Sequence, residues 1–456
     1  MGTHIGDRAI VLGGGIAGLT AANVLAEAYT EVLVVDRDHL TGESAWRRGA
    51  PQGRHINGLL ARGHQALEEL FPGITDELVA DGVPLSDLSG TVRWYFNGRQ
   101  LRQKRAGLTS VAATRPVMEA HIYRRVAALP NVEFVGGCDI TGLATTPDRK
   151  RVTGVRVHHK AIGRGDEVLN ADLVVDACGR GSRTHLWLAE WGYPEVKEEG
   201  TKIGLGYGTR HYRLRNDPLG DDVSIVSVAS PELPRGAICT KTDGGRIELT
   251  TYGILGDHPP TDPEGYTEFV RSLATQDIYE LIRDAEPLDD PVQFRFPTTL
   301  RRRYEWLNRF PDRLLVLGDA VCSPNPVFAQ GQTLAALEAL ALRKHLNRGS
   351  TPDPRAFARD VGRVIDPAWE MTTSMSLTFP DVPGRRSLKT KINHAYLARI
   401  QAAATRDSRI TAAFLSTAGL VSPPQSILRP GFVWRVLRLS RRTGRSAVAR
   451  PASVST

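Results

Sequence analysis

The sequence predicts an α/β protein in which a Rossmann-like nucleotide-binding domain carries an inserted antiparallel β-sheet domain and is followed by a helical C-terminal region. The chain opens with an apolar strand, a glycine turn, a helix and a second strand within residues 9–36. Two further apolar runs, 173–175 and 314–317, each end in a polar turn, as buried parallel strands do. Residues 200–300 instead alternate between β-branched or aromatic and polar side chains, the pattern of an antiparallel sheet.

The opening turn has the spacing of a phosphate-binding loop. Gly13, Gly15 and Gly18 form the pattern G-x-G-x-x-G between the apolar run and the helix-forming residues 17–28. Gly13 permits a tight turn, Gly15 lets a pyrophosphate approach the backbone, and Gly18 lets the helix pack on the strand. The helix N-terminus offers free N–H groups and the positive end of its dipole to the phosphates.

The second strand of this segment, 32–35, ends in Asp36. A carboxylate at this position binds the diol of a ribose and repels a 2′-phosphate, so the site favours FAD or NAD over NADP. The motif does not choose between FAD and NAD.

Composition indicates a soluble globular protein of two or three domains, with 456 residues, 41% of them hydrophobic and 24% charged. No stretch reaches the roughly 18 to 20 uninterrupted apolar residues of a membrane span, and the polar residues 1–8 are not typical of a signal peptide. The four cysteines are scattered without C-x-x-C, so neither a disulfide framework nor a metal site is expected: Cys138, Cys178, Cys239 and Cys322. We therefore expect a cytoplasmic protein.

The net charge of +8 is concentrated at the C-terminus. Eight arginines, and no acidic residue or lysine, follow residue 408, so residues 1–407 carry no formal net charge. A balanced body gives no indication of nucleic-acid binding, whereas the basic tail, 423–456, favours at most weak contact with a membrane surface or an acidic partner. Residues 432–439 have the pattern of a short amphipathic helix, but a disordered polar tail is the favoured interpretation.

Further candidate ligand-binding residues lie in turns outside the opening segment. Residues 46–53 are rich in Gly, Pro and Arg and form a loop that enters a helix at 57–71. Arg48, Gln52 and His55 lie on this entry, although composition alone favours a solvated basic loop. In addition, Arg115 precedes a helix that begins at Pro116, while Asp176 and Asp319 follow predicted strands at the edge where α/β sheets bind ligands.

The remaining elements follow from periodicity and turn residues. Asn97-Gly98 between the runs 91–96 and 100–105 predicts a β-hairpin. A small meander is expected at 132–135, 152–158 and 167–171, and helices at 264–275, 278–285, 332–346 and over most of 351–418.

Three elements at strand ends, far apart in the sequence, point to the same chemistry: the glycine turn with Asp36, the run from Asp176 to Ser182, and Gly318-Asp319 with its Pro/Gly loop. Over about residues 8–350 this set resembles the FAD-dependent monooxygenases of the aromatic-hydroxylase superfamily, which carry G-x-G-x-x-G, D-G and G-D motifs. The phrases RRGAPQGRH, TRPVME, VVDACGRGSR and SPNPVFAQGQT are similar to the actinobacterial flavin epoxidases of polyether biosynthesis, of the lasalocid and monensin epoxidase type.

The resemblance implies a division of the chain into four parts. The FAD-binding domain is discontinuous, at 1–80, 106–190 and 301–350, and the substrate-binding sheet domain comprises 81–105 and 191–300. A C-terminal helical region at 351–422 and the basic tail follow.

The chain departs from the family pattern at three positions. Asp36 stands where glutamate is usual, Ala177 where the D-G pair has glycine, and Ala329 where a G-Q-G run is common. The aspartate keeps the ribose contact with a shorter reach. The added methyl group of Ala329 lies where it could tilt or shift the flavin ring.

The resemblance also implies roles for individual residues. Arg37 lies against the adenine, Arg115 reaches the adenosine or pyrophosphate, and Asp319 binds a ribityl hydroxyl. N–H groups near Gly331 and Gln332 face the flavin pyrimidine edge, where a helix N-terminus stabilises negative charge. Arg48, Gln52 and His55 line the isoalloxazine region as candidate catalytic residues. The full set expected to bind FAD is Gly13, Gly15, Ile16, Ala17, Gly18, Asp36, Arg37, Arg48, Arg115, Asp176, Gly179, Gly318, Asp319, Pro326, Gly331 and Gln332.

The activity implied by the resemblance is oxygen transfer from a hydroperoxide that O2 forms at C4a of the reduced flavin. We expect epoxidation of an alkene in a polyketide or terpenoid of antibiotic biosynthesis, a reaction in which no protein base activates the substrate. The expected partners are that hydrophobic substrate and NAD(P)H, used directly or through a separate flavin reductase.

Other functions remain open from the sequence. An aromatic hydroxylase would use a base, for which the candidates are His211, Tyr207, Tyr212 and His55. A reductase or desaturase of a polyprenyl chain and a non-catalytic flavin-binding module are further alternatives. A halogenase is disfavoured because the run Trp94-Tyr95-Phe96 lacks the spacing W-x-W-x-I-P.

Overall fold

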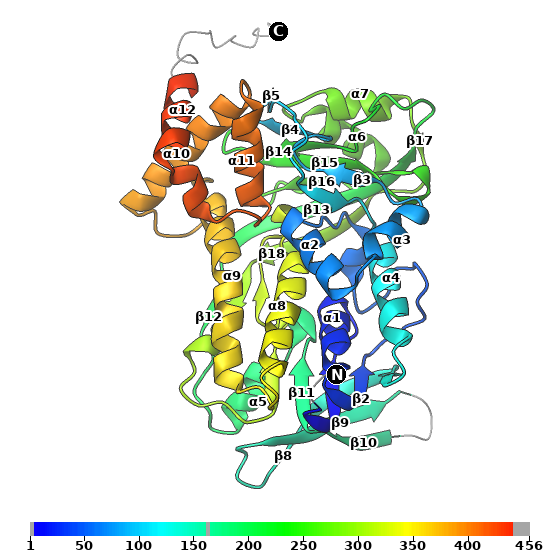
Figure 1. Cartoon of the computed structure of the whole chain (residues 1–456). Coiled ribbons are helices and arrows are strands. Elements are labelled where there is room, and N and C mark those ends of the chain that lie inside the picture. Colours follow the sequence, from blue (N-terminus) through cyan, green and yellow to red (C-terminus); the bar gives the residue numbers. More distant parts are fainter. Residues whose placement is uncertain (1–3, 161–164, 441–456) are drawn as a thin grey trace, which may run out of the picture.

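The computed structural model describes residues 4–160 and 165–440. A parallel sheet and its helices form the lower half of the molecule in Figure 1, and a mixed sheet with its own helices forms the upper half. The C-terminal helices run along one side of both halves.

Five parallel strands form the nucleotide-binding sheet in the order β20-β11-β1-β2-β7. Their bounds are Gly6–Leu12 (β1), Tyr29–Val35 (β2), Val132–Val135 (β7), Leu173–Asp176 (β11) and Leu314–Val316 (β20). In register, Leu12 pairs with Asp176, and Asp176 pairs with Val316. The three strands that precede the predicted motifs are therefore neighbours, and the turns after them lie side by side.

Helices and a meander bury the two faces of this sheet. The helices of this half are Ile16–Leu25 (α1), Ala61–Leu70 (α2), Ile74–Ala80 (α3), Arg115–Ala127 (α4), Thr184–Glu190 (α5) and Gly331–Leu346 (α8). The meander consists of Cys138–Thr145 (β8), Val152–His159 (β9) and Gly165–Asn170 (β10). The prediction that 132–135 belongs to it is wrong, because this segment is β7 and pairs in parallel with β2. Alternation along β1 places Val11 against the helices and Ile10 with Leu12 against the meander, so both faces are apolar.

The second large sheet has eight strands, in the order β17-β13-β16-β15-β14-β4-β5 with β18 also on β13. They span Val92–Phe96 (β4), Arg99–Gln100 (β5), Lys202–Arg213 (β13), Ser224–Val228 (β14), Arg235–Lys241 (β15), Ile247–Gly253 (β16), Glu286–Pro287 (β17) and Val292–Thr298 (β18). The sheet is not wholly antiparallel as predicted, because β4 enters it parallel to β14. The predicted strand at 100–105 is also shorter, since β5 ends at Gln100.

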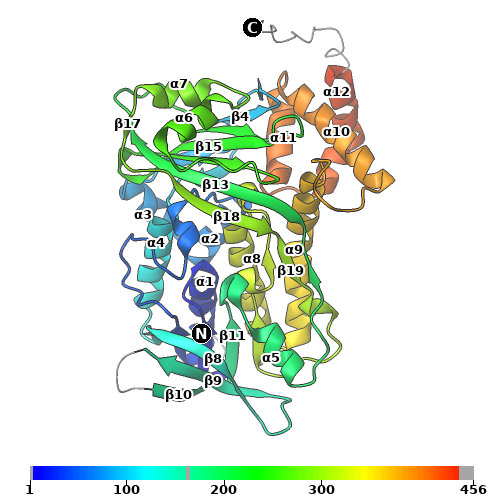
Figure 2. The ribbon, with the colours of Figure 1, turned by 180° about the vertical axis from the view of Figure 1, so that it is seen from behind.

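The two faces of the mixed sheet have different neighbours. Helices α6 (Pro263–Arg271) and α7 (Asp277–Arg283) cover one face, where Ile247 and Leu249 of β16 are buried. By alternation, Glu248 and Thr250 face the opposite side, toward the parallel-sheet half. Figure 2 shows β13 crossing above that half, with the β8–β10 meander at the far end.

Short paired strands connect the two halves. They are Leu85–Asp87 (β3) with Thr109–Val111 (β6), and Glu198–Glu199 (β12) with Leu300–Arg302 (β19) and Cys322–Ser323 (β21).

The C-terminal region contains α9 (Pro354–Ser376), α10 (Leu388–Ala404), α11 (Ser408–Ala418) and α12 (Pro430–Ser440). The expectation of a disordered tail is wrong for 430–440, because Val436 is buried and, with Phe432, packs against Ile400 of α10. The rest of the tail, 441–456, lies outside the described residues. Among the helices of the described ranges, none is long and apolar enough to cross a membrane.

Candidate functional site

The glycine turn after β1 places its three glycines in three different environments. Gly13 has φ +96, and a Cβ there would lie 2.6 Å from the carbonyl oxygen of Ala177. A Cβ on Gly18 would lie 1.8 Å from the carbonyl oxygen of Gly13, so strand and helix touch at this point. A Cβ on Gly15 would meet only side-chain tips, at 3.6 Å or more. Gly15 therefore borders open space, which is the position predicted for a pyrophosphate.

Two arginines face that open space. The guanidinium groups of Arg47 and Arg115 lie 3.6 and 3.8 Å from the ideal Cβ position of Gly15. Helix α1 begins at Ile16, and no side chain caps its N-terminus. Free N–H groups, the positive helix end and two guanidinium groups together suit a diphosphate.

Arg47 is the main site residue that sequence reasoning missed. It lies 3.4 Å from Asp36, 3.3 Å from Asp38 and 3.4 Å from Glu119. Burial opposes its charge, but Glu119, Asp36 and Asp38 outweigh this effect and raise the pKa of Arg47. Its neighbour Arg48 is exposed. Both arginines stand in the same basic loop, so only the distant acidic partners decide which one turns inward.

Asp36 also organises the turn itself. Its carboxylate accepts hydrogen bonds from the backbone N–H of Gly14 at 2.6 Å and from that of Asp38 at 2.8 Å. The side chain of Arg37 is exposed, and its carbonyl oxygen accepts from Lys160 at 3.1 Å. The carboxylate of Asp36 thus lies at the end of β2, beside the glycine turn and Arg47.

The motif that follows β11 is ordered by its own aspartate. Asp176 accepts hydrogen bonds from the Cys178 N–H at 2.9 Å, the Thr184 hydroxyl at 2.6 Å and the Ser182 hydroxyl. Its oxygens are therefore engaged within the turn, so Asp176 shapes the site through the backbone. Gly179 has φ +68, and a Cβ built on it would lie 4.0 Å from the Cβ of Asp319.

The third motif meets the first two at the same edge. A Cβ on Gly318 would lie 2.7 Å from the Cβ of Ala17 in α1, and one on Gly331 would lie 3.9 Å from Asp319 Oδ1. Burial raises the pKa of the Asp319 carboxyl, while Arg115 and Arg180 act in the opposite direction. The parallel strands thus bring together residues predicted from three distant segments.

The start of α8 contains buried polar atoms without partners. Among the described residues, Gln330 Nε2, Gln332 Oε1 and Asn57 Nδ2 have no hydrogen bond. Such atoms are costly when buried unless a ligand or water pairs with them. Gln332 Nε2 does donate to the Asn57 carbonyl at 3.3 Å, which holds the loop before α2 against α8. The unpaired amide groups, together with the first N–H groups of α8, fit the polar edge of a flavin ring.

The loop before α8 contains a strained alanine. Ala329 follows the short helix Pro326–Phe328, in which Pro326 is exposed, and has φ +53. A side chain in this left-handed region is disfavoured relative to glycine. The methyl group of Ala329 also lies 2.8 Å from the ideal Cβ position of Gly58. The departure from the family pattern therefore has a visible conformational cost.

The candidate catalytic residues occupy different surroundings. His55 is buried and hydrogen-bonded through Nδ1 to the Thr209 hydroxyl at 2.9 Å, with Tyr207 edge-on at 4.9 Å. Burial, followed by Arg54 and His211, lowers the pKa of His55 to about 4, so the ring is neutral at pH 7. Gln52 is half-buried in the short helix Pro51–Arg54, and Arg48 is exposed. Of the three, only His55 joins the loop to β13.

A second group of titratable side chains lies farther along the same face of the mixed sheet. His211 of β13 bonds through Nδ1 to Asp289 at 2.6 Å and pairs across strands with Glu248 of β16. Burial, helped by Asp243 and Asp289, raises the pKa of Glu248 to about 7 against the opposing effects of His211 and Arg246. Sequence reasoning named His211 but missed Glu248, whose alternating neighbours gave no sign of which face it occupied.

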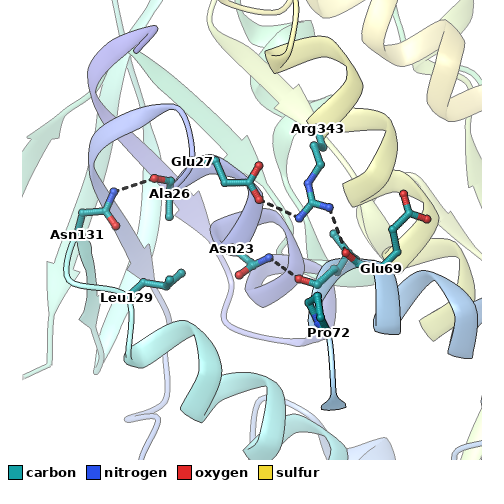
Figure 3. A pocket seen from close by; sticks show the side chains of 9 residues that line it. Asn23, Ala26, Glu27, Glu69, Pro72, Leu129, Asn131 and Arg343 are labelled. Atoms are coloured by element: carbon teal, nitrogen blue, oxygen red, sulfur yellow. Dashed lines mark hydrogen bonds and ion pairs between the residues drawn. The ribbon is translucent and has the colours of Figure 1, made fainter. Parts of the chain in front are cut away.

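Figure 3 shows a separate hollow of about 460 Å³ at the C-terminal end of α1. Its polar groups bond to one another: Asn23 donates to the Leu70 carbonyl at 3.0 Å, and Arg343 contacts Glu27 at 2.9 Å. It lies at the end of α1 opposite to the glycine turn and contributes nothing to the site above. In the described ranges, no group of three or more His, Cys, Asp or Glu side chains could hold a metal ion.

Comparison with known proteins agrees with this geometry. Residues 9–222 match the family described as FAD dependent oxidoreductase. Protein Rv3254 of Mycobacterium tuberculosis is 33% identical over 392 residues, which cover 82% of this chain and 81% of that protein. A kynurenine 3-monooxygenase of Salinispora arenicola is 27% identical over 351 residues, covering 74% of this chain and 71% of that protein.

Among solved structures, a flavoprotein/dehydrogenase from Cytophaga hutchinsonii has a TM-score of 0.68 at 14% identity, covering 96% of this chain and 98% of that one. This likeness concerns the fold alone. This likeness confirms the expected α/β fold, and the family match together with the monooxygenase relative confirms FAD as the expected cofactor. The chain belongs to the FAD-dependent oxidoreductases, as an enzyme of the monooxygenase type.

Proposed function

We propose that this enzyme epoxidises a carbon–carbon double bond in a largely apolar natural product of the polyketide or terpenoid kind. The observation that carries the proposal is the neutral, aromatic surrounding of His55. The rings of Tyr207 and Phe294 stack with their centroids 5.4 Å apart, and both contact the His55 ring, so three uncharged rings form one wall. An isolated alkene suits this wall because it needs no ionisation before it accepts oxygen.

FAD, when bound, supplies the electrons and the activated oxygen for this transfer. The residues of the chain would hold the cofactor. Arg47 and Arg115 would balance the diphosphate, Asp36 and Asp319 would bind ribose and ribityl hydroxyls, and the start of α8 would stabilise negative charge on the ring. The buried wall around Tyr207 orients the apolar substrate and keeps water away from the reacting oxygen. His55 stays neutral and aligns the loop with β13 through Thr209.

Aromatic hydroxylation is the second candidate function. It is favoured by Glu248, a buried carboxyl with a pKa of about 7 next to the His211–Asp289 pair. A group that titrates near neutral pH can accept the proton of a phenol and so make its ring nucleophilic. The activity named for the Salinispora relative, on kynurenine, belongs to the same class.

The two candidates differ in product and in pH dependence. FAD-loaded protein would be incubated with NADPH or NADH, with and without an added flavin reductase, and with a panel of terpenoid alkenes and phenols under ¹⁸O2. Epoxidation predicts a labelled product that mild acid opens to a diol, whereas hydroxylation predicts a labelled phenol resistant to acid. A labelled phenol as the sole product would reject the epoxidase proposal.

The electron source is tested in the same assay. Turnover with NAD(P)H alone would establish a self-sufficient enzyme, and turnover only after adding the reductase would establish a two-component one. Consumption of reductant without any oxygenated product from either panel would contradict both candidate functions and favour a reductase or desaturase.

A further inference from the structure

The C-terminal helices expose large apolar side chains. Of the eleven exposed large hydrophobic side chains among the described residues, four lie between residues 388 and 434. Their exposed fractions are 75% for Leu388, 58% for Ile392, 58% for Leu428 and 63% for Trp434. We call these four residues the apolar tips. Single exposed apolar residues are common, but a group of this size marks an interaction surface.

The apolar tips are not part of the packing that holds these helices together. On α12, Phe432 and Val436 point inward to α10, whereas Trp434 and Arg438 point outward, with the Arg438 guanidinium 5.4 Å from the Trp434 ring. On α10, Leu388 and Ile392 are four residues apart and share one side of the first two turns.

The segments that carry the two sets of apolar tips pack against one another. The hydroxyl of Tyr396, four residues after Ile392, donates to the Ile427 carbonyl at 2.6 Å, which places Leu428 beside α10. Figures 1 and 2 both show α10 and α12 together at the end of the molecule away from the β8–β10 meander.

The charge around the apolar tips is almost entirely positive. Residues 385–440 contain ten arginines and lysines and a single acidic residue, Asp407, which pairs with Arg435 at 3.3 Å. The exposed cations nearest in sequence to the tips are Arg385, Lys389, Lys391, Arg429 and Arg438. This surface is therefore apolar and cationic at the same time.

We propose that this surface docks the enzyme on an anionic phospholipid bilayer, with the apolar tips among the acyl chains and the surrounding Lys and Arg side chains on lipid phosphates. Leucine, isoleucine and tryptophan flanked by basic residues are the combination that lies in a membrane interface. A second copy of the chain is a poorer occupant, because it would bring an equally positive surface against this one.

The docking surface lies close to segments that contact the mixed sheet. Leu377 and Phe379, just before α10, belong to the same buried cluster as Tyr207 and Tyr252 of the mixed sheet. The rings of Phe414 in α11 and Phe96 in β4 are in contact, with their centroids 5.7 Å apart. The segment just before α10 and helix α11 thus contact the mixed sheet, on the face that the proposed function assigns to the substrate. An apolar compound dissolved in a bilayer would therefore have a short path to that face. The docking itself does not depend on which reaction the enzyme catalyses.

Sedimentation with vesicles tests the proposal on the full chain loaded with FAD. Vesicles of equal parts phosphatidylcholine and phosphatidylglycerol should pellet the wild type, and vesicles of phosphatidylcholine alone should leave it in the supernatant. The double variant Leu388→Ser/Ile392→Ser should bind the anionic vesicles at least about tenfold more weakly. Leu186→Ser, which removes an exposed leucine at the opposite end of the molecule, is the matched control and should bind like wild type.

A spectroscopic measurement distinguishes insertion from simple charge attraction. Brominated acyl chains in the anionic vesicles should quench more tryptophan fluorescence in the wild type than in Trp434→Phe. Wild type that stays in the supernatant, or a double variant that binds as tightly as wild type, would overturn the proposal. So would a dimer in solution that the double variant abolishes, because the apolar tips would then face a second copy.

Discussion

Substituting alanine for Gly15 should separate cofactor binding from folding. Gly15 has φ −78 and ψ −179, values that any residue adopts, and an added methyl group would meet no atom closer than 3.6 Å. As the residue before α1, it loses about 1 kcal/mol or less of helix-capping preference when glycine becomes alanine. The methyl group would instead occupy the space between the turn and the arginines, and would hold a diphosphate away from the backbone N–H groups.

The expected loss of FAD affinity is about tenfold to a hundredfold, since each hydrogen bond from a backbone N–H to a charged phosphate contributes about 1.5 kcal/mol or more. Gly18→Ala should instead lower the stability of the fold. Its methyl group would lie 1.8 Å from the Gly13 carbonyl oxygen, a backbone contact that costs about 3 kcal/mol or more of stability even without FAD.

Urea unfolding of the FAD-free variants and titration of each with FAD, followed by flavin fluorescence, measure the two effects. Gly431→Ala, at a position with no atom within 4 Å, is the control for a harmless glycine substitution. Unchanged FAD affinity in Gly15→Ala, or equal stability of Gly15→Ala and Gly18→Ala, would refute this assignment of the turn.

Three further predictions concern the residues around the site. Arg47→Met should weaken FAD binding about tenfold or more while the exposed Arg48→Met does not, and equal losses in a fluorescence titration would contradict the placement of Arg47. Glu248 has a pKa of about 7 in the folded chain and 4.5 ordinarily, so the wild type should lose stability as pH rises through that window. By urea unfolding, Glu248→Gln should be about 3 kcal/mol more stable than the wild type at pH 8 but not at pH 4. Ala329→Gly should relieve the left-handed backbone, and a thermal melt should show a gain of up to about 1 kcal/mol rather than the usual loss from adding glycine.

The edge of the parallel sheet could be predicted from sequence because its determinants are local. Each of β1, β11 and β20 is an apolar run followed by a glycine turn, and parallel neighbours end at the same edge. The hydrogen-bond partners of Asp176, at the end of β11, could not be predicted from the sequence. Ser182 and Thr184 stand in the same stretch, but only the folded turn shows that they take up the Asp176 carboxylate.

Which side chains of a loop or strand point into the site depends on partners that are distant in the sequence. Arg47 and Arg48 are equivalent by composition, and Glu119 of α4 selects the first. On β16, alternation predicts that Glu248 and Leu249 face opposite sides, but the helices that cover one side decide which of the two becomes a titrating group near His211. The prediction of a disordered tail failed because its many arginines suggested a solvated segment, whereas Val436 on the same segment is buried.

Electrostatic balance connects these observations. Around Gly15, Arg47 and Arg115 are engaged by Asp36, Asp38 and Glu119, so the side chains at the turn carry no excess of positive charge. A diphosphate must therefore compete with Glu119, which contacts both arginines, and the backbone N–H groups at the start of α1 supply the advantage that an acidic side chain lacks. In the segment that contains α10 and α12, residues 385–440, ten Lys and Arg residues are accompanied by a single acidic residue. The chain thus compensates its arginines where a small ligand binds and leaves them uncompensated where we expect an extended anionic surface.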